Sequence, residues 1–261
     1  PYIEEVLKDR ETRPSEQAEI KPQNFEPSKE FFKAANANLS KTNYYRGISE
    51  QTLNKYRVGY ISRWKHPKAP ANIPESPRLI IPNDDGGYLA RDTRLNLTPM
   101  QKKYSKQKVT PTGLFNSVAL LESEQPVYIV EGEIDALSII DGGGQAVALG
   151  STANVSKLLE VVKKNKPAQS LIITLDSDEA GKKAADTLEA GLTELNISFY
   201  RHNLPVEYKD ANEFLMKDRD AFTKWVNEGK TPISEREAVS YKLTDFLATV
   251  KKNREGRAIP T

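Results

Sequence analysis

The sequence of 261 residues contains no cysteine and only two histidines, His66 and His202. The missing thiols exclude disulfide bonds, a cysteine nucleophile and every zinc or iron–sulfur site that cysteine would hold. Any metal site must therefore use carboxylates, which favour hard cations such as Mg²⁺, Mn²⁺ or Ca²⁺. Long apolar runs are also missing. None approaches the roughly 18 residues that a membrane span needs, and no N-terminal stretch is typical of a signal peptide.

Net charge is almost absent, because 38 basic residues balance 36 acidic ones, but the two signs are unevenly distributed. Residues 78–109 hold seven basic side chains against three acidic ones, whereas residues 127–215 hold eight basic against fourteen acidic. Such runs commonly form ordinary solvated surface. The alternative interpretation is that a surface for a polyanion precedes a surface for metal ions along the chain.

The first half of the chain predicts a small α+β subdomain, which we place at residues 30–120. The polar residues 1–29 carry three internal prolines and indicate a linker or arm. Ser28 and Ser49 each predict the start of a helix. Strands are expected at 58–61, 78–82 and 88–91, the last two joined as a hairpin by the turn sequence at 83–87.

The second half alternates apolar strand-like segments with helical ones. Strands are expected at 127–130, 146–149, 171–175 and 197–200, with helices at 133–140, 154–164, 179–194, 211–217 and 219–227. This alternation predicts a parallel sheet with right-handed crossovers, covered on both faces. The expected fold class is an α/β domain over residues 121–230, preceded by the smaller α+β subdomain. Residues 231–261 are expected to be a further linker.

Acidic residues follow the strands of this predicted sheet. Glu131 comes directly after the strand at 127–130, Asp176 and Asp178 after the strand at 171–175, and Asp210 after the last strand. Such positions share one edge of a parallel sheet, where open α/β sheets bind ligands. Converging carboxylates repel one another unless a cation compensates them, so we expect divalent metal and phosphoryl chemistry. An acid after a strand is also a common helix N-cap, and Asp178 fits that alternative.

Several segments carry a resemblance to a known family. VEGEIDAL at 130–137, ALGST at 148–152 and LDSDEAGKKAA at 175–185 resemble the TOPRIM domain, and most closely that of bacterial and phage DNA primases. KDANEFL at 209–215 is similar to the last primase motif, with Asn212 in place of its second acid. YRGIS at 45–49, YRVGY at 56–60, RLIIP at 78–82 and the basic run near 102–105 are similar to successive upstream elements. The resemblance covers residues 44–216.

The resemblance implies the primase core of a phage or mobile-element primase–helicase. Such a core makes RNA primers on single-stranded DNA from nucleoside triphosphates, in the cytoplasm of a bacterium or of a phage-infected cell. The implied partner is a replicative helicase domain in the same full-length polypeptide. The implied Mg²⁺ or Mn²⁺ ligands are Glu131, Asp176, Asp178 and Asp210, the first three catalytic, with Asp135 and Asn212 in support. The implied contacts to nucleotide or DNA are Arg78, Arg91, Lys102, Lys103, Tyr104 and Lys106.

Structural interpretations of single residues, and two other functions of the whole chain, stay open at this point. Asp135 is equally well interpreted as a helix-surface charge, and Tyr104 as a core or surface tyrosine. A TOPRIM nuclease would use the same acids to hydrolyse phosphodiesters, although the basic α+β region disfavours it. A non-catalytic module that binds single strands or loads a helicase is favoured only by Asn212. We interpret His66 as a loop residue and His202 as structural.

Overall fold

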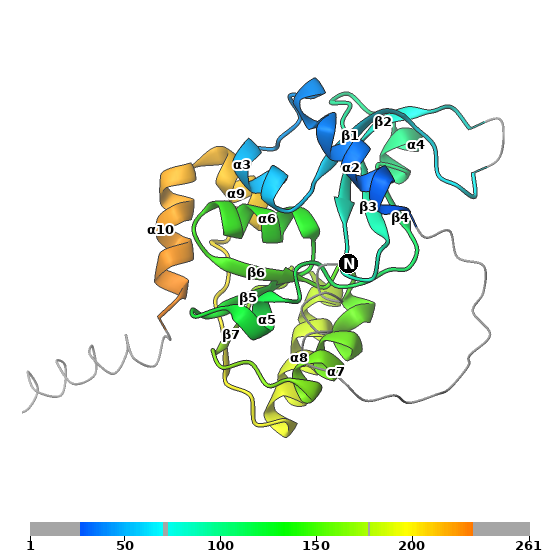
Figure 1. The fold of residues 1–261 in the computed structure, drawn as a ribbon. Helices are drawn as coiled ribbons and strands as arrows, with labels where there is room; N and C mark the ends of the chain where they lie inside the picture. Colours follow the sequence, from blue (N-terminus) through cyan, green and yellow to red (C-terminus); the bar gives the residue numbers. More distant parts are fainter. Residues whose placement is uncertain (1–26, 70–72, 177, 232–261) are drawn as a thin grey trace, which may run out of the picture.

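The computed structural model describes residues 27–69, 73–176 and 178–231, which build two four-stranded sheets (Figure 1). Sheet A is antiparallel with the order β1-β2-β3-β4, and sheet B is parallel with the order β6-β5-β7-β8. Most of the predicted N-terminal arm and of the C-terminal linker lies outside the described residues. Among the described helices, none combines the length and apolar character needed to cross a bilayer.

The first part of the chain contributes sheet A and short helices around it. Its strands are β1 (Gly59–Trp64), β2 (Ser76–Pro82), β3 (Tyr88–Asp92) and β4 (Lys106–Val109). Its helices are α2 (Lys29–Ala37), η1 (Leu39–Lys41), α3 (Glu50–Lys55) and α4 (Pro99–Lys103). The predicted helix starts are confirmed, because the hydroxyls of Ser28 and Ser49 accept hydrogen bonds from the backbone N–H groups of Phe31 and Thr52.

The second part contributes sheet B and the helices that cover it. Its strands are β5 (Val127–Val130), β6 (Gln145–Ala148), β7 (Leu171–Ile173) and β8 (Phe199–Arg201). Its helices are α5 (Ala119–Glu122), α6 (Glu133–Asp141), η2 (Thr152–Asn154), α7 (Val155–Lys164), α8 (Glu179–Glu194), α9 (Ala211–Lys217) and α10 (Arg219–Gly229). The predicted fold class, a parallel α/β domain preceded by a smaller α+β part, is confirmed.

Successive residues of sheet B point to opposite faces, as the period of a strand requires. Tyr128 and Val130 join the cluster that contains residues of α6, α9 and α10, whereas Val127 and Ile129 join the cluster that contains residues of α7 and α8. Figure 1 shows these two helical layers on either side of the sheet. Because β5 is fully buried between them, its sequence contains only apolar residues and tyrosine.

The two sheets share one hydrophobic core. Leu79 and Leu89 of sheet A belong to the same buried cluster as Tyr128 and Ile172 of sheet B. The opposite face of sheet A packs on α2 through Ile80. The shared core fixes the two sheets against each other, so side chains of sheet A keep a defined position relative to the acids of sheet B.

Candidate active site

The predicted acids come from three loops at the carboxyl edge of sheet B. Glu131 directly follows β5, and Asp176 follows β7 after two intervening residues. Asp178 and Asp210 are the N-cap residues of α8 and α9, where their carboxylates accept hydrogen bonds from the N–H groups of Gly181 at 2.8 Å and Glu213 at 2.7 Å. The helix-capping alternative is therefore correct for Asp178, and it applies to Asp210 as well. Capping uses one carboxylate oxygen of each, so it leaves the other free for a further ligand.

Two glycines permit the close packing around these acids. A Cβ atom at Gly132 would come 2.6 Å from a carboxylate oxygen of Asp135, and one at Gly181 would collide with the carbonyl oxygen of Asp176. Any larger residue would push these groups apart. The glycines of the EG and DEAG sequences thus serve the arrangement of the carboxylates.

The acids at this edge lie close enough to influence one another. Burial, then the charge of Asp176, raises the pKa of Glu131, while burial and Asp210 raise the pKa of Asp176. Asp135, on the first turn of α6, is affected most: burial and the charge of Asp210 raise its pKa to about 7. The five acids Glu131, Asp135, Asp176, Asp178 and Asp210 are called the acidic edge below. Its mutual repulsion is the reason why a bound cation would stabilise it.

The acidic edge fits a hard divalent cation by the chemistry of its donors. In the described part of the chain, however, no three histidine, aspartate or glutamate side chains are grouped so that they would hold a metal ion by themselves. Mg²⁺ is commonly bound through one or two carboxylates together with substrate phosphates and water. The edge therefore matches a site that is completed by a phosphorylated ligand rather than a closed protein cage.

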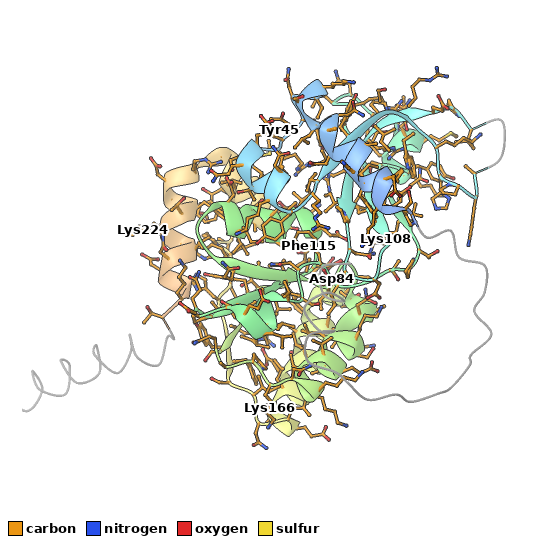
Figure 2. The ribbon with its side chains drawn as sticks, in the orientation of Figure 1. Tyr45, Asp84, Lys108, Phe115, Lys166 and Lys224 are labelled. Atoms are coloured by element: carbon orange, nitrogen blue, oxygen red, sulfur yellow. The ribbon has the colours of Figure 1, made fainter. Side chains whose placement is uncertain are left out.

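Two lysines of sheet A act electrostatically on the acids at this edge. Lys106 and Lys108 alternate along β4. Burial raises the pKa of Glu131 and of Glu133, a buried glutamate of α6, and the charges of the two lysines partly offset this rise. Lys106 also offsets part of the rise in the pKa of Asp135 and Asp176. The ammonium group of Lys108 donates a hydrogen bond to the carbonyl oxygen of Gly150, and Figure 2 shows Lys108 beside the junction of the two sheets.

Lys108 and Glu133 are site neighbours to which the sequence analysis gave no role. The period-two spacing of Lys106 and Lys108 was the available signal, because it places both side chains on one face of a strand. The run has a single apolar residue, Val109, so β4 was not recognised as a strand. Its formation depends on pairing with β3, where Lys106 lies opposite Arg91 and Lys108 opposite Leu89.

The other predicted contacts to nucleic acid lie at different places. Arg91 of β3 is partly exposed and lies near Tyr44. Burial tends to raise the pKa of Tyr44, but hydrogen bonds from Arg46 and Arg91 outweigh this effect and lower it. Lys102 and Lys103 are exposed at the end of α4, followed by the half-exposed Tyr104. Together with Lys106 they form an open basic surface over α4 and β4, which we call the basic ramp (Lys102, Lys103, Tyr104, Lys106).

Arg78 differs from this group because it is buried, with 3% of its surface exposed. Its guanidinium donates hydrogen bonds to the carbonyl oxygens of Tyr104 at 2.8 Å and Ser105 at 3.1 Å, and it lies 3.5 Å from the carboxylate of Asp92. It also covers the ring of Trp64. This environment favours a structural role, in which Arg78 anchors the end of α4, over the predicted contact with a nucleic acid.

Asn212 is fully buried and also has a structural environment. Its side-chain amide donates to the carbonyl oxygen of Arg46 and to the hydroxyl of Ser138, both at 2.9 Å, and its oxygen accepts from Nε of Arg46. Its backbone N–H donates to the carboxylate of Asp135 at 3.1 Å. Because the amide oxygen is already engaged, Asn212 supports the site by holding Asp135 and the loop of Arg46 rather than by offering a ligand.

The two histidines lie in environments that agree with their interpretation. His66 lies in the loop after β1 and accepts a hydrogen bond from the N–H of Lys68. His202 stacks on Trp225 with ring centroids 4.6 Å apart. Neither contributes to the acidic edge.

Known proteins share part of this sequence and its fold. Residues 128–215 match the model of the family described as Toprim-like, so the acidic edge lies in a Toprim-like domain. This match confirms the resemblance noted in the sequence motifs. No curated protein sequence matches the chain.

Three solved structures share the fold over most of the chain. The RNA polymerase domain of Mycobacterium tuberculosis primase DnaG has a TM-score of 0.54 and 18% identity, covering 80% of this chain and 86% of that one. The structure of the Aquifex aeolicus primase, with its zinc-binding and RNA polymerase domains, has a TM-score of 0.53 and 19% identity. The match covers 76% of this chain but only 58% of that one.

The third structure is that of bacteriophage T7 lagging-strand DNA polymerase interacting with primase domains of two gp4 subunits, bound to an RNA/DNA hybrid and dTTP. One of its chains has a TM-score of 0.50 and 19% identity, covering 76% of this chain and 94% of that one. At such identities the likeness establishes the fold, while the chemistry must be argued from the site.

Proposed function

We propose that this chain is the catalytic core of a DNA primase, which joins nucleoside triphosphates into short RNA primers on a single-stranded DNA template. The observation that carries the proposal is the position of Lys106. Lys106 belongs to the basic ramp of sheet A, and its positive charge offsets part of the rise that burial causes in the pKa of four acids at or beside the acidic edge. Phosphoryl transfer uses both kinds of group, because carboxylates hold metal ions and basic side chains neutralise phosphate charge.

The chain would use its two charged surfaces for different parts of one substrate complex. Glu131, Asp176, Asp178 and Asp210 would hold Mg²⁺ or Mn²⁺, which neutralises phosphate charge and aligns the triphosphate when bound. Lys106 and Lys108 would contact the triphosphate oxygens. In the reaction, a 3′-hydroxyl would lose its proton to water as its oxygen attacks the α-phosphorus, and the bond between the α-phosphorus and the oxygen that bridges to the β-phosphate would break, so that pyrophosphate leaves.

The template would lie along the basic ramp. Lys102 and Lys103 offer exposed ammonium groups to phosphates, and Tyr104 offers a half-exposed ring on which a base can stack. Such contacts do not depend on base sequence, which suits a strand that is read by pairing with incoming nucleotides. The helicase partner remains an expectation from the resemblance.

The proposal is tested by incorporation of labelled nucleotide on single-stranded DNA with Mg²⁺ or Mn²⁺. The wild type should produce RNA oligomers that disappear with EDTA and in the Asp176→Asn/Asp178→Asn double variant. Lys106→Ala should reduce the yield on the order of tenfold or more, because a charge-assisted phosphate contact is lost. Asp220→Asn and Lys166→Ala, which change exposed residues away from the edge, should retain full yield.

Two results would replace this proposal by its alternatives. Degradation of the template that depends on the same acids, with no product, would identify a nuclease. Retained binding of single-stranded DNA without any reaction, and without Mn²⁺ binding by calorimetry, would identify a non-catalytic binding module.

A further inference from the structure

A cavity of about 830 Å³ lies at the end of sheet B opposite to the acidic edge. Its lining includes Gln145, which begins β6, and Gln125, which precedes β5, whereas the acidic edge follows the ends of β5 and β7. Its other walls come from the turn after α3 and from the end of β2, so the cavity lies where the two sheets meet. Figure 2 shows two of its lining residues, Asp84 and Phe115, at that junction. Its size is that of a small-molecule site.

The residue Arg57 has an unusual backbone conformation at this cavity. Helix α3 ends in a Schellman motif, in which the N–H of Val58 donates to the carbonyl of Leu53 and that of Arg57 to Asn54. Arg57 therefore takes the left-handed position, with φ of 56°. Glycine or asparagine normally occupies this position, because a longer side chain is disfavoured there sterically. Arg57 holds this position despite that cost, and the Schellman hydrogen bonds fix where its side chain starts at the cavity wall.

No ion pair or hydrogen bond within the described residues occupies the guanidinium of Arg57, which is exposed. Lys55, two residues earlier, also forms no ion pair there, and its ammonium group lies 5.6 Å from the centre of the Tyr56 ring. The Tyr56 ring is half-buried and lies against Phe115, with centroids 5.6 Å apart. One wall thus offers two cations beside a flat aromatic ring.

The facing wall has a different character and a fixed backbone. Asp84 accepts hydrogen bonds from the N–H groups of Asn116 at 3.1 Å and Ser117 at 2.7 Å, which holds Asn116 at φ of 60°. Glu122 and Glu124 at the end of α5 add acceptors to this wall. They disfavour a run of several phosphates but can accept hydrogen bonds from sugar hydroxyls or base amino groups.

We propose that this cavity binds a single nucleotide unit, with its phosphate at Lys55 and Arg57 and its base against Tyr56. The acidic facing wall argues for one nucleotide rather than for a track of strand. Its source is either a free nucleotide or one residue of a nucleic acid. The site does not rest on the proposed priming activity, because none of its lining residues belongs to the acidic edge or to the basic ramp.

The test is photo-crosslinking of the full chain with azido-ATP in EDTA, followed by peptide mapping. Label is expected in peptides that contain Tyr56 or Phe115. Arg57→Asn should reduce this label about tenfold, whereas Arg57→Lys, which keeps the charge, should retain most of it. Asn196→Gly is the matched control, because Asn196 occupies the same left-handed position after α8 and lies outside the cavity.

Competition then separates the two sources. Loss of label with unlabelled ATP but not with an equal nucleotide concentration of oligothymidylate would indicate a free nucleotide, and loss with both would indicate a unit of a strand. Label confined to peptides of the basic ramp or of the acidic edge would overturn the proposal. So would equal labelling of the cavity in wild type and Arg57→Asn. Both readouts are independent of primer synthesis, so a chain without that activity still tests the cavity.

Discussion

Two sets of acids in this molecule differ in their electrostatics. At the acidic edge, burial and neighbouring carboxylates raise the pKa of Glu131, Asp135 and Asp176. At the end of α6, by contrast, hydrogen bonds from Ser49, Thr52 and Arg219 overcome burial and lower the pKa of Asp141. An acid that serves the fold has its partners within the chain. Acids whose charges repel one another, although three of them also accept backbone hydrogen bonds, indicate a site that awaits a ligand.

The acidic edge should be the place where loss of charge destroys function without loss of fold. Asp176→Asn is expected to reduce nucleotide incorporation on the order of 100-fold or more, since phosphoryl transfer depends on charge neutralisation. Its midpoint of unfolding in urea should be unchanged or higher, because the substitution removes repulsion. A large fall in the midpoint would show instead that Asp176 is a structural acid like Asp141.

Asp141 should show the reverse behaviour. It accepts hydrogen bonds from the hydroxyl of Thr52 at 2.7 Å and from the guanidinium of Arg219 at 2.9 Å, and its side chain is 3% exposed. Asp141→Ala is expected to lower the free energy of unfolding by about 2–4 kcal/mol, because these donors lose a charged acceptor. Urea denaturation measures this, with Asp220→Ala as the control on an exposed acid. If Asp141→Ala lowers the free energy of unfolding no more than Asp220→Ala does, Asp141 is not the structural acid that we describe.

The substitution Asn212→Asp tests whether an acid at position 212 behaves like the acidic edge or like the structural Asp141. The new carboxylate can still accept from Arg46, but it cannot donate to the carbonyl oxygen of Arg46, and it adds a charge near Asp135. We expect a loss of about 1–3 kcal/mol in the free energy of unfolding. Unchanged stability together with stronger Mn²⁺ binding by calorimetry would show that position 212 belongs to the acidic edge after all.

The pH dependence of stability should separate the groups by its sign. The pKa of Asp141 is lowered from 3.8, so this group stabilises the fold fully above that value. Its contribution is lost as the pH falls through the folded-state pKa. The difference in the free energy of unfolding between wild type and Asp141→Asn should therefore be constant near pH 7 and shrink below about pH 4. A difference that persists at pH 2 would show that packing rather than charge is responsible.

Much of sheet B could be predicted because its signals are local. The strand at 127–130 and the helix at 179–194 have the same limits in the structure. Sheet A was less predictable, since β4 carries the pattern of an exposed basic run and α4 begins with Pro99 in a segment without apolar periodicity. Both elements depend on contacts with β3 and with Arg78, which are distant in the sequence.

The candidate site divides in the same way. The residue order alone shows that acids follow the strands of sheet B and that a lysine-rich run comes earlier in the chain. A parallel sheet must bring the ends of its strands together. The sequence by itself therefore determined the fold class, the Toprim-like motifs and the membership of the acidic edge. Only the tertiary structure decided that the charge of Lys106 acts on those acids, that Arg78 and Asn212 are buried, and that a cavity opens near the starts of β5 and β6. These depend on how sheet A packs on sheet B, and packing across a shared core joins residues that no local pattern relates.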